Sequence, residues 1–311
     1  MTTDLLRVDP DNPDPALIER AAAVIRAGGL VAFPTETVYG LGANALDAAA
    51  VGRIFAAKGR PATNPVIVHV ADVSDAVNVT AEWPATAGAL AARFWPGPLT
   101  LVLPRGPAVP DVVTAGGPTV AVRCPAHPVA RALIRAAGVP IAAPSANRST
   151  ELSPTRAEHV VKGLAGRIDL ILDGGRCQGG IESTVVDMTG TRVRVLRPGL
   201  ITSPMLEAVV GSIDSQREPS TSTIARSPGQ MAKHYSPHTP VVLVAPGAEQ
   251  RYGERVGLLQ NMPDCPTAYA AVLYDRLHEL DWEGYERIVI ELPPDTADWA
   301  GVRDRLMRAA E

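Results

Sequence analysis

Short apolar runs alternate along this chain with longer segments in which apolar positions recur every three or four residues. The short runs predict buried strands, and the longer segments predict amphipathic helices. In the first two-thirds of the chain the helices are predicted over 15–27, 48–58 (capped by Asp47), 85–94 and 128–137. The strands are predicted over 30–33, 66–70, 99–103, 119–123, 141–143, 168–172, 183–188 and 192–196. Because several strand pairs have no helix between them, we expect an α/β fold with a mixed, twisted, open sheet.

The last third of the chain predicts a second, smaller unit. Periodicity is lost from 212 to 240, where Ser, Thr, Pro and Gly abound. Beyond it, strands over 241–244, 256–259 and 288–290 and helices over 268–280 and 302–310 predict a small Rossmann-like α/β domain. We therefore divide the chain into a first domain (1–211), a linker (212–240) and a C-terminal domain (241–311). A connection of this length is either disordered or functional. The alternatives are a plain tether between the domains and a lid over the nucleotide, and we interpret the linker as a lid.

Composition and charge narrow the class of protein. With 46% hydrophobic and 20% charged residues, the 311-residue chain has the composition of a water-soluble globular protein. No apolar run approaches the ~20 residues of a membrane span, and no signal-peptide pattern opens the chain. A formal charge of −4 argues against broad or tight nucleic-acid binding. Three scattered cysteines, odd in number and not in metal-ligand spacing, favour a reducing cytoplasm over a disulfide framework or a zinc site.

A rigid polar segment follows the helix predicted over 48–58. It carries two basic residues, an amide and an imidazole: Lys58, Arg60, Asn64 and His69. Prolines on both sides of Asn64 stiffen the connection, which helps to aim polar groups. However, cations at the end of a helix often only offset its dipole, and a lone histidine in an apolar strand is usually a satisfied core residue. Both the functional and the structural interpretation of this segment stay open at this point.

Further polar residues stand at the ends of predicted strands: Thr37, Thr119, Arg123, Ser145, Asn147, Glu182, Ser183, Thr184 and Arg197. Each alone fits a turn or a cap, but open α/β sheets bind ligands at their strand ends. Ser153 before Pro154 predicts a helix start, whose N–H groups would favour an anion. No nucleophile stands beside a candidate base. The pattern therefore predicts a site that orients a nucleotide and a small charged substrate.

Two other classes of function are alternatives to such a site. Residues 40–45 fit G-x-G-x-x-A, which would suggest a nicotinamide-dependent oxidoreductase. The match is weak, because the glycines do not directly follow the strand and no acidic residue stands where the ribose ligand belongs. The second alternative is an RNA-binding module without chemistry of its own. The acidic charge and the lack of an aromatic platform oppose it.

Together, Lys58-Gly59-Arg60 and Ser145-Ala146-Asn147 form a K-x-R…S-x-N pattern. This pattern resembles the signature of the YrdC-type family, the threonylcarbamoyl-AMP synthases. Further similar segments are 33–41, 64–69, 94–100, 182–187 and 196–199, and 227–229, 234–237 and 304–306 resemble the long, two-domain form. The resemblance covers nearly the whole chain. One departure is Thr150, where the family usually has glycine, and it concerns the path of a loop.

The resemblance implies a nucleotidyltransferase that converts L-threonine, bicarbonate and ATP, with Mg²⁺, to threonylcarbamoyl-AMP and pyrophosphate. The product would pass to downstream tRNA threonylcarbamoyl-transferase proteins. By motif position, the implied ATP-binding residues are Arg60, Asn64, Thr119, Ser145, Asn147, Ser153, Arg197 and Tyr235. The implied threonine-binding residues are Thr37, His69, Arg123, Ala143 and Ser183. Catalysis would rest on positioning and charge neutralisation, with Lys58 and Arg60 as the catalytic residues and no metal held by the protein itself.

Overall fold

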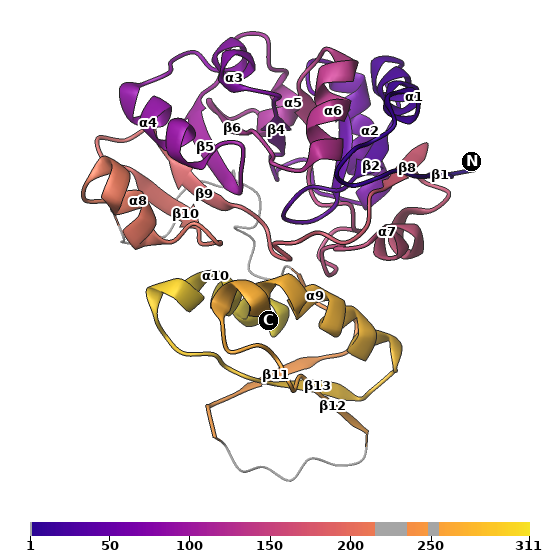
Figure 1. Ribbon diagram of the computed structural model, residues 1–311, viewed down its shortest axis with the longest axis vertical. Coiled ribbons are helices and arrows are strands. Elements are labelled where there is room, and N and C mark those ends of the chain that lie inside the picture. Colours follow the sequence, from indigo (N-terminus) through magenta and orange to yellow (C-terminus); the bar gives the residue numbers. More distant parts are fainter. Residues whose placement is uncertain (1, 215–234, 248–254) are drawn as a thin grey trace.

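The computed structural model describes residues 2–214, 235–247 and 255–311. The first domain (2–214) lies above the C-terminal domain (241–247 and 255–311), and residues 235–240 lead into the latter (Figure 1). Most of the predicted lid, residues 215–234, lies outside the described residues. The amide of Asp214 donates to the carbonyl of Val193 at 2.8 Å, so the chain is still attached to the first domain just beyond residue 211. The predicted domain boundaries stay a prediction.

Within the described residues, the first domain is built on a ten-stranded sheet with the strand order β1-β8-β2-β3-β7-β4-β6-β5-β9-β10. The sheet combines parallel pairs, such as β4 with β6, and antiparallel pairs, such as β5 with β6, which confirms the expected mixed sheet. In chain order the strands are β1 (Asp4–Arg7), β2 (Val31–Phe33), β3 (Gly40–Asn44), β4 (Ile67–His69), β5 (Leu99–Pro104), β6 (Thr119–Arg123), β7 (Ile141–Ala142), β8 (Leu170–Asp173), β9 (Thr184–Asp187) and β10 (Arg194–Arg197).

Helices cover both faces of this sheet (Figure 1). One apolar core joins α1 and α6 to one face, and a second joins α2, α3, α5 and α7 to the other. A third lies between α4, α8 and strands β5, β9 and β10. The helices are α1 (Pro15–Arg26), α2 (Ala48–Lys58), α3 (Val73–Val79), α4 (Ala85–Phe94), α5 (Asp111–Thr114), α6 (Pro128–Ala137), α7 (Ala157–Leu164) and α8 (Ser203–Val210).

Strand β3 corrects one sequence-based expectation. Residues 34–44 lie outside the predicted helices and strands, where we expected a loop, but β3 pairs antiparallel with β2, with Gly42 opposite Val31. A Cβ at Gly42 would lie 2.7 Å from side-chain carbons of both Ile141 and Phe33. Glycine is therefore required here by close packing within the sheet. The G-x-G-x-x-A match marks a strand and not a phosphate-binding turn, which removes the basis for a nicotinamide site.

The C-terminal domain has the predicted Rossmann-like character. Its three strands, β11 (Val241–Val244), β12 (Val256–Leu258) and β13 (Arg287–Glu291), are parallel and lie in the order β11-β13-β12. Helices α9 (Pro266–Trp282) and α10 (Ala300–Ala309), with the short 3-10 helix η1 (Ala297–Trp299), complete the domain. Both α-helices lie between the small sheet and the first domain (Figure 1).

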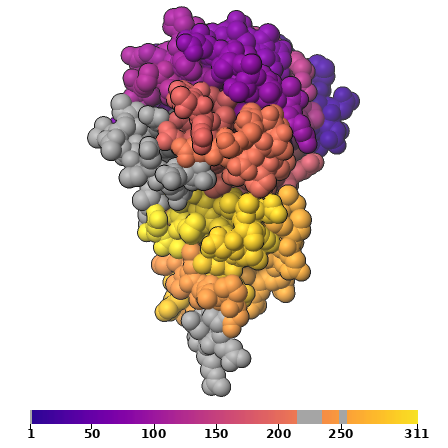
Figure 2. Space-filling model, turned by 90° about the vertical axis from the view of Figure 1, so that its left-hand side faces the viewer, coloured from indigo at the N-terminus to yellow at the C-terminus, as the bar shows by residue number. Residues whose placement is uncertain are grey.

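The two domains share a tightly packed interface, and Figure 2 shows them in direct contact. The apolar core of the C-terminal domain includes Val38, Leu152 and Ile181 of the first domain. Beside it, Asp275 of α9 accepts hydrogen bonds from Arg156, the shortest at 2.8 Å. Burial alone would raise the pKa of Asp275, but the bonds and charge of Arg156 hold it below its ordinary value. The C-terminal domain is thus fixed to the first domain by both apolar packing and buried charge.

Candidate active site

A cleft of about 490 Å³, including the space at its open mouth, lies at strand ends of the large sheet next to the interface. The tyrosine that begins the connecting segment 235–240 also reaches it. The cleft is lined by Thr35, Thr37, Val38, Gly40, Arg60, Ile67, His69, Arg123, Ala143, Pro144, Ser145, Glu182, Ser183, Arg197 and Tyr235.

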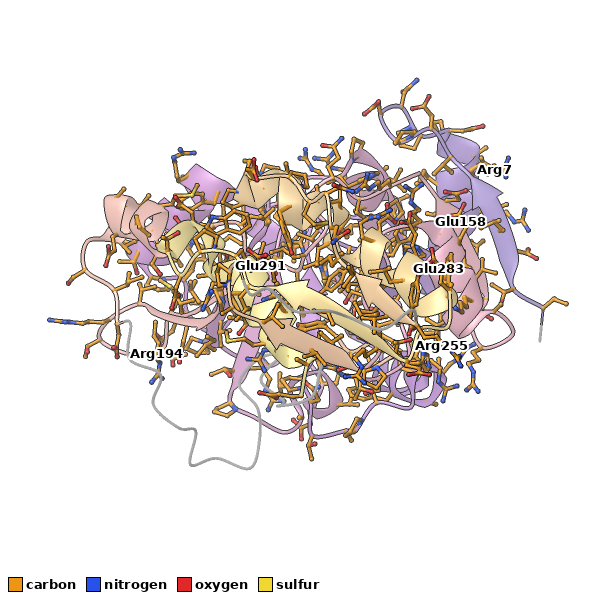
Figure 3. The ribbon with its side chains drawn as sticks, turned by 90° about the horizontal axis from the view of Figure 1, so that it is seen from below. Arg7, Glu158, Arg194, Arg255, Glu283 and Glu291 are labelled. Carbon is orange, nitrogen blue, oxygen red and sulfur yellow. The ribbon has the colours of Figure 1, made fainter. Side chains whose placement is uncertain are left out.

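The lining of this cleft is cationic. Arg60, Arg123 and Arg197 are each at least 93% buried, against a single lining carboxylate, Glu182. The outer surface differs from the cleft in that it carries charges of both signs. Figure 3 shows arginines and glutamates of both domains spread over the view, with Arg7, Glu158, Arg194, Arg255, Glu283 and Glu291 labelled. Buried cations in excess over anions favour an anionic ligand in the cleft.

Arg60 shapes the loop that it belongs to. Its Nε donates to the carbonyl of Asn64 at 3.1 Å, and a terminal nitrogen donates to that of Pro65 at 2.8 Å. Burial lowers the pKa of Arg60 to about 10, and the nearby charge of Arg197 adds to the effect. The guanidinium therefore stays charged near neutral pH. Asn64 itself is buried beside the cleft but does not line it.

Lys58 connects the two halves of the K-x-R…S-x-N pattern. Its Nζ donates to the backbone carbonyls of Ser145, at 2.6 Å, and Asn147, and to the side-chain oxygen of Asn147 at 3.3 Å. Burial and then the charge of Arg60 lower the pKa of Lys58 well below its ordinary value. Gly59 makes this approach possible, because its left-handed backbone (φ 63°) ends helix α2 directly after the lysine.

A second cluster joins His69, Arg123 and Thr37. A terminal nitrogen of Arg123 donates to Oγ1 of Thr37 at 2.9 Å, and the guanidinium forms an ion pair with Glu36 at 2.6 Å. Burial and the charge of Arg123 lower the pKa of His69 to about 3, so the imidazole is neutral. Its Nδ1 has no hydrogen-bond partner among the described residues. A buried, neutral imidazole nitrogen that lines a cleft can bind a polar ligand atom.

A third cluster joins Ser183, Arg197 and Tyr235. Arg197 donates to the carbonyl of Ser183 at 3.0 and 3.1 Å and to its Oγ at 3.1 Å. It also donates to the hydroxyl oxygen of Tyr235 at 3.2 Å. Tyr235 is almost fully buried and has a left-handed backbone (φ 65°). Such a conformation costs energy in a non-glycine residue, and it persists here because the side chain is held in the cleft.

The structure brings most of the sequence-predicted residues together. Nine of the fourteen line the cleft: Thr37, Arg60, His69, Arg123, Ala143, Ser145, Ser183, Arg197 and Tyr235. Lys58 and Asn147 contact it through Ser145, as described above. Thr119 begins β6 opposite Pro104 and does not line it. The ligand assigned to each residue stays a prediction.

Ser153 corrects another expectation. Helix α7 begins at Ala157 with Arg156 as its N-cap, so Ser153 is not at a helix start. Its hydroxyl instead donates to a carboxylate oxygen of Glu182 at 2.5 Å, and the residue is fully buried. A serine before a proline predicts a helix start only where its side chain is free to cap the backbone. Here the hydroxyl of Ser153 donates to the buried carboxylate of Glu182 and does not cap a helix.

Glu182 is the main cleft residue to which the sequence assigned no role. Its place just before β9, among the polar residues at strand ends, is the signal that sequence reasoning could have used. Burial alone would raise the pKa of Glu182, but Arg305, Arg197 and the bond from Ser153 outweigh it and hold it below its ordinary value. Five other lining residues, also without a predicted role, are Thr35, Val38, Gly40, Ile67 and Pro144.

In the parts of the chain that the structure describes, no group of three His, Cys, Asp or Glu residues could hold a metal ion. None of the described helices is long and apolar enough to cross a membrane. The fold and the cleft thus define the class: an α/β protein whose strand ends form a buried, cationic site for a polar, anionic ligand.

Comparison with known proteins narrows this class. Residues 23–199 match the family described as "Telomere recombination", and residues 201–311 match the one described as "Threonylcarbamoyl-AMP synthase, C-terminal domain". The chain is 43% identical to the threonylcarbamoyl-AMP synthase of Bacillus subtilis, covering 100% of this chain and 96% of the relative. It is 42% identical to that of Pyrococcus abyssi, covering 94% of each.

Solved structures agree with the sequence comparison. The crystal structure of P. abyssi Sua5 complexed with L-threonine is 40% identical and superposes with a TM-score of 0.93, covering 99% of this chain and 98% of that one. The chain therefore belongs to the threonylcarbamoyl-AMP synthase family, in its two-domain form.

Proposed function

We propose that this protein is an L-threonylcarbamoyladenylate synthase, which converts L-threonine, bicarbonate and ATP to threonylcarbamoyl-AMP and pyrophosphate. The observation that carries the proposal is the contact of Lys58 with both Ser145 and Asn147 beside a cleft lined by three buried arginines. It joins the two halves of the family's signature at one cationic site.

The reaction is a nucleotidyl transfer in two steps. The threonine nitrogen forms a bond to the carbon of bicarbonate with loss of water, giving a carbamate. A carbamate oxygen then attacks the α-phosphorus of ATP, and the bond to the pyrophosphate oxygen breaks. The second step needs mainly alignment of the reactants and neutralisation of the phosphate charge, and it needs no covalent intermediate on the protein.

The cluster around Arg123 would bind threonine. The guanidinium of Arg123, already oriented by Glu36 and Thr37, suits a carboxylate. The free Nδ1 of the neutral His69 can meet a polar atom of the amino acid. The full proposed set is Thr37, His69, Arg123, Ala143 and Ser183.

Other arginines of the cleft would bind ATP. Arg60 and Arg197 suit phosphate oxygens because a guanidinium donates two parallel hydrogen bonds. Lys58 holds the segment from Ser145 to Asn147 in place, so its contribution to catalysis runs through that segment. The full proposed set is Arg60, Asn64, Thr119, Ser145, Asn147, Ser153, Arg197 and Tyr235.

A Mg²⁺ ion would accompany ATP, with phosphate oxygens as its ligands, because the described residues offer no acidic cluster to hold it. The product is a mixed anhydride and would be consumed by proteins that transfer the threonylcarbamoyl group to tRNA. The cytoplasmic location expected from the three cysteines stays a prediction.

Pyrophosphate release tests this proposal. We expect release from ATP to require both threonine and bicarbonate, and leaving out either one should abolish it. A tRNA gel shift in the absence of other proteins separates the proposal from the RNA-binding alternative. Tight tRNA binding without threonine-dependent pyrophosphate release would contradict the assignment.

A further inference from the structure

We propose that Arg305, in helix α10 of the C-terminal domain, is a positioning residue for the synthase site. Its guanidinium holds the two chain segments that carry Ser183 and Arg197. This inference rests on the proposed function, and it gives the C-terminal domain a defined part in that function.

Arg305 is almost completely buried, and its hydrogen bonds cross the domain interface. Its Nε donates to a carboxylate oxygen of Glu182 at 2.7 Å. One terminal nitrogen donates to the carbonyl of Pro198 at 3.0 Å, and the other donates to the carbonyl of Glu182 at 3.2 Å. A single planar group from the C-terminal domain thus bridges two separate segments of the first domain.

The two carbonyls lie directly beside cleft residues. Glu182 immediately precedes Ser183, and Pro198 immediately follows Arg197. Ser183 and Arg197 in turn bond to each other, at 3.0 and 3.1 Å. Fixing the neighbouring peptide units fixes the direction in which both side chains enter the cleft, without any contact between Arg305 and a ligand.

Charges around Arg305 hold the guanidinium in place. Asp304 accepts hydrogen bonds from Arg305 at 2.8 Å and from Arg308 at 3.1 Å. Toward the cleft, Tyr274 of α9 donates to Glu182 at 3.2 Å, and the guanidinium lies 5.3 Å from the centre of the Tyr235 ring. An ion pair buried this deeply is strongly disturbed when one partner is removed, because the other is left uncompensated.

Backbone packing independently brings α10 to the same place. A Cβ at Gly301 would lie 2.9 Å from both the Cα and the carbonyl oxygen of Gly199. Real Cβ atoms essentially never approach that closely, so glycine at 301 lets α10 touch the segment that follows Arg197. The helix that carries Arg305 is therefore seated directly against one of the two segments that Arg305 holds.

The test compares Arg305→Lys with Arg303→Lys. Lysine at 305 keeps the charge but donates from a single nitrogen, which cannot take the places of the three guanidinium nitrogens that reach Glu182 and Pro198. Arg303, by contrast, donates to the carbonyl of Pro293 and forms an ion pair with Asp295, both in its own domain. For Arg305→Lys we expect the Kd values of threonine and ATP to rise about tenfold each. A tenfold change in Kd corresponds to the net contribution of roughly one hydrogen bond. Arg303→Lys should stay within about twofold of the wild type.

A second variant covers the case in which Arg305→Lys does not fold. Gly301→Ala leaves every charge in place and displaces α10 from Gly199, so it should also weaken both ligands. Its control is Gly52→Ala, a helix glycine with nothing within 4 Å of the added Cβ. Unfolding curves confirm that each variant is folded at the assay temperature.

The outcomes separate this inference from the proposed function. A wild type that makes no threonylcarbamoyl-AMP would overturn the function. A wild type that makes it, with folded Arg305→Lys and Gly301→Ala variants that bind both ligands as the wild type does, would overturn the positioning role alone. Weaker binding by either folded variant, with normal binding by its control, supports it.

Discussion

At the scale of single residues, the cleft depends on groups that shape the protein and face the ligand at once. Arg60 lines the cleft and also donates hydrogen bonds to the backbone carbonyls of Asn64 and Pro65. Changing such a residue therefore alters stability and function together, and the two must be measured separately. Thr150 is different: it does not line the cleft, but it holds a left-handed backbone (φ 74°) while its carbonyl accepts a hydrogen bond from the amide of Ser236 at 2.9 Å.

Replacing Arg60 by alanine should lower threonylcarbamoyl-AMP formation by about 10- to 150-fold. The physical reason is the loss of a charge-assisted contact to phosphate, ~1.5–3 kcal/mol in the transition state. Because the side chain is only 7% exposed, we also expect some loss of stability, and rates should be measured well below the unfolding midpoint. Arg20→Ala, at an exposed ion pair with Asp4, is the control. Turnover within about twofold of wild type would refute the role of Arg60.

Thr150→Gly should raise the free energy of unfolding by about 0.5–1 kcal/mol. A left-handed backbone costs a β-branched residue ~1–2 kcal/mol, and glycine removes this cost. The greater conformational entropy of glycine in the unfolded chain offsets part of the gain in stability. Ser149→Gly has no left-handed strain to relieve and should be slightly destabilising. Urea unfolding of both variants decides the matter, and a Thr150→Gly protein less stable than Ser149→Gly would contradict the explanation.

At the scale of elements, the sequence predicted the long, periodic pieces and missed those defined by tertiary contacts. Helices α1, α2 and α6 carry clear caps and apolar faces and begin and end within about a residue of the prediction. Strand β3 has no alternation to reveal it, because its glycines are selected by packing against Phe33 and Ile141. The short elements β1, α3, α5 and α8 were missed for lack of a sustained period.

The candidate site follows the same division. Cleft residues within family motifs, such as Arg60 and Ser183, were found from the sequence. Thr35 and Ile67 were not assigned, because nothing in a local pattern tells which side of a short strand or turn faces a cleft. The role of Glu182 depends on Arg305, which is 123 positions away in the chain. Contacts over such separations are set by domain packing and have no local signature.

Gly180→Ala should destabilise the protein by about 2–4 kcal/mol. Its backbone is left-handed (φ 71°), which costs alanine ~1 kcal/mol, and its Cβ would fall 2.0 Å from the carbonyl oxygen of Ala270 in α9. Gly175→Ala is the matched control, because that glycine is also left-handed (φ 80°) but has nothing within 4 Å. The difference between the two urea-unfolding free energies isolates the contact with α9. Equal losses of stability in the two variants would show that α9 shifts to make room for the added Cβ.

At the scale of the whole molecule, the two domains meet through a stacked pair of histidines. His159 of α7 and His278 of α9 lie with ring centroids 3.8 Å apart, at an interplanar angle of 27°. Burial lowers the pKa of His159 to about 4, and burial with the neighbouring His159 lowers that of His278 to about 3. Both rings are therefore neutral in the folded protein near neutral pH, and protonating either one opposes the domain contact.

The stability of the protein should consequently fall as the pH drops from 7 to 5. In the unfolded chain each histidine takes up its proton near pH 6.5, whereas in the folded protein it does so only near pH 3–4, so the unfolded state binds more protons in this window. The loss is about 2 kcal/mol per histidine over these two pH units, and the buried His69, whose pKa is also lowered to about 3, adds a similar loss. Asp275, whose pKa is also lowered, contributes only below this range. Urea unfolding at both pH values measures the effect.

His278→Gln removes one of these proton-binding groups and should reduce the pH dependence of the unfolding free energy. His238→Gln, at a largely exposed histidine that bridges to Asp281, is the control and should leave it nearly unchanged. An equal pH dependence in wild type and His278→Gln would show that the histidine pair is not buried neutral at the interface.

The central claim is that one cationic cleft joins threonine, bicarbonate and ATP. Mass spectrometry of the product, after incubation with ATP, ¹³C-labelled bicarbonate and L-threonine, tests it most directly. We expect threonylcarbamoyl-AMP that carries the label in its carbamoyl carbon, formed together with pyrophosphate, and a much smaller amount with Arg60→Ala. An unlabelled threonyl-adenylate, or no adenylate at all from the folded wild-type protein, would contradict this function.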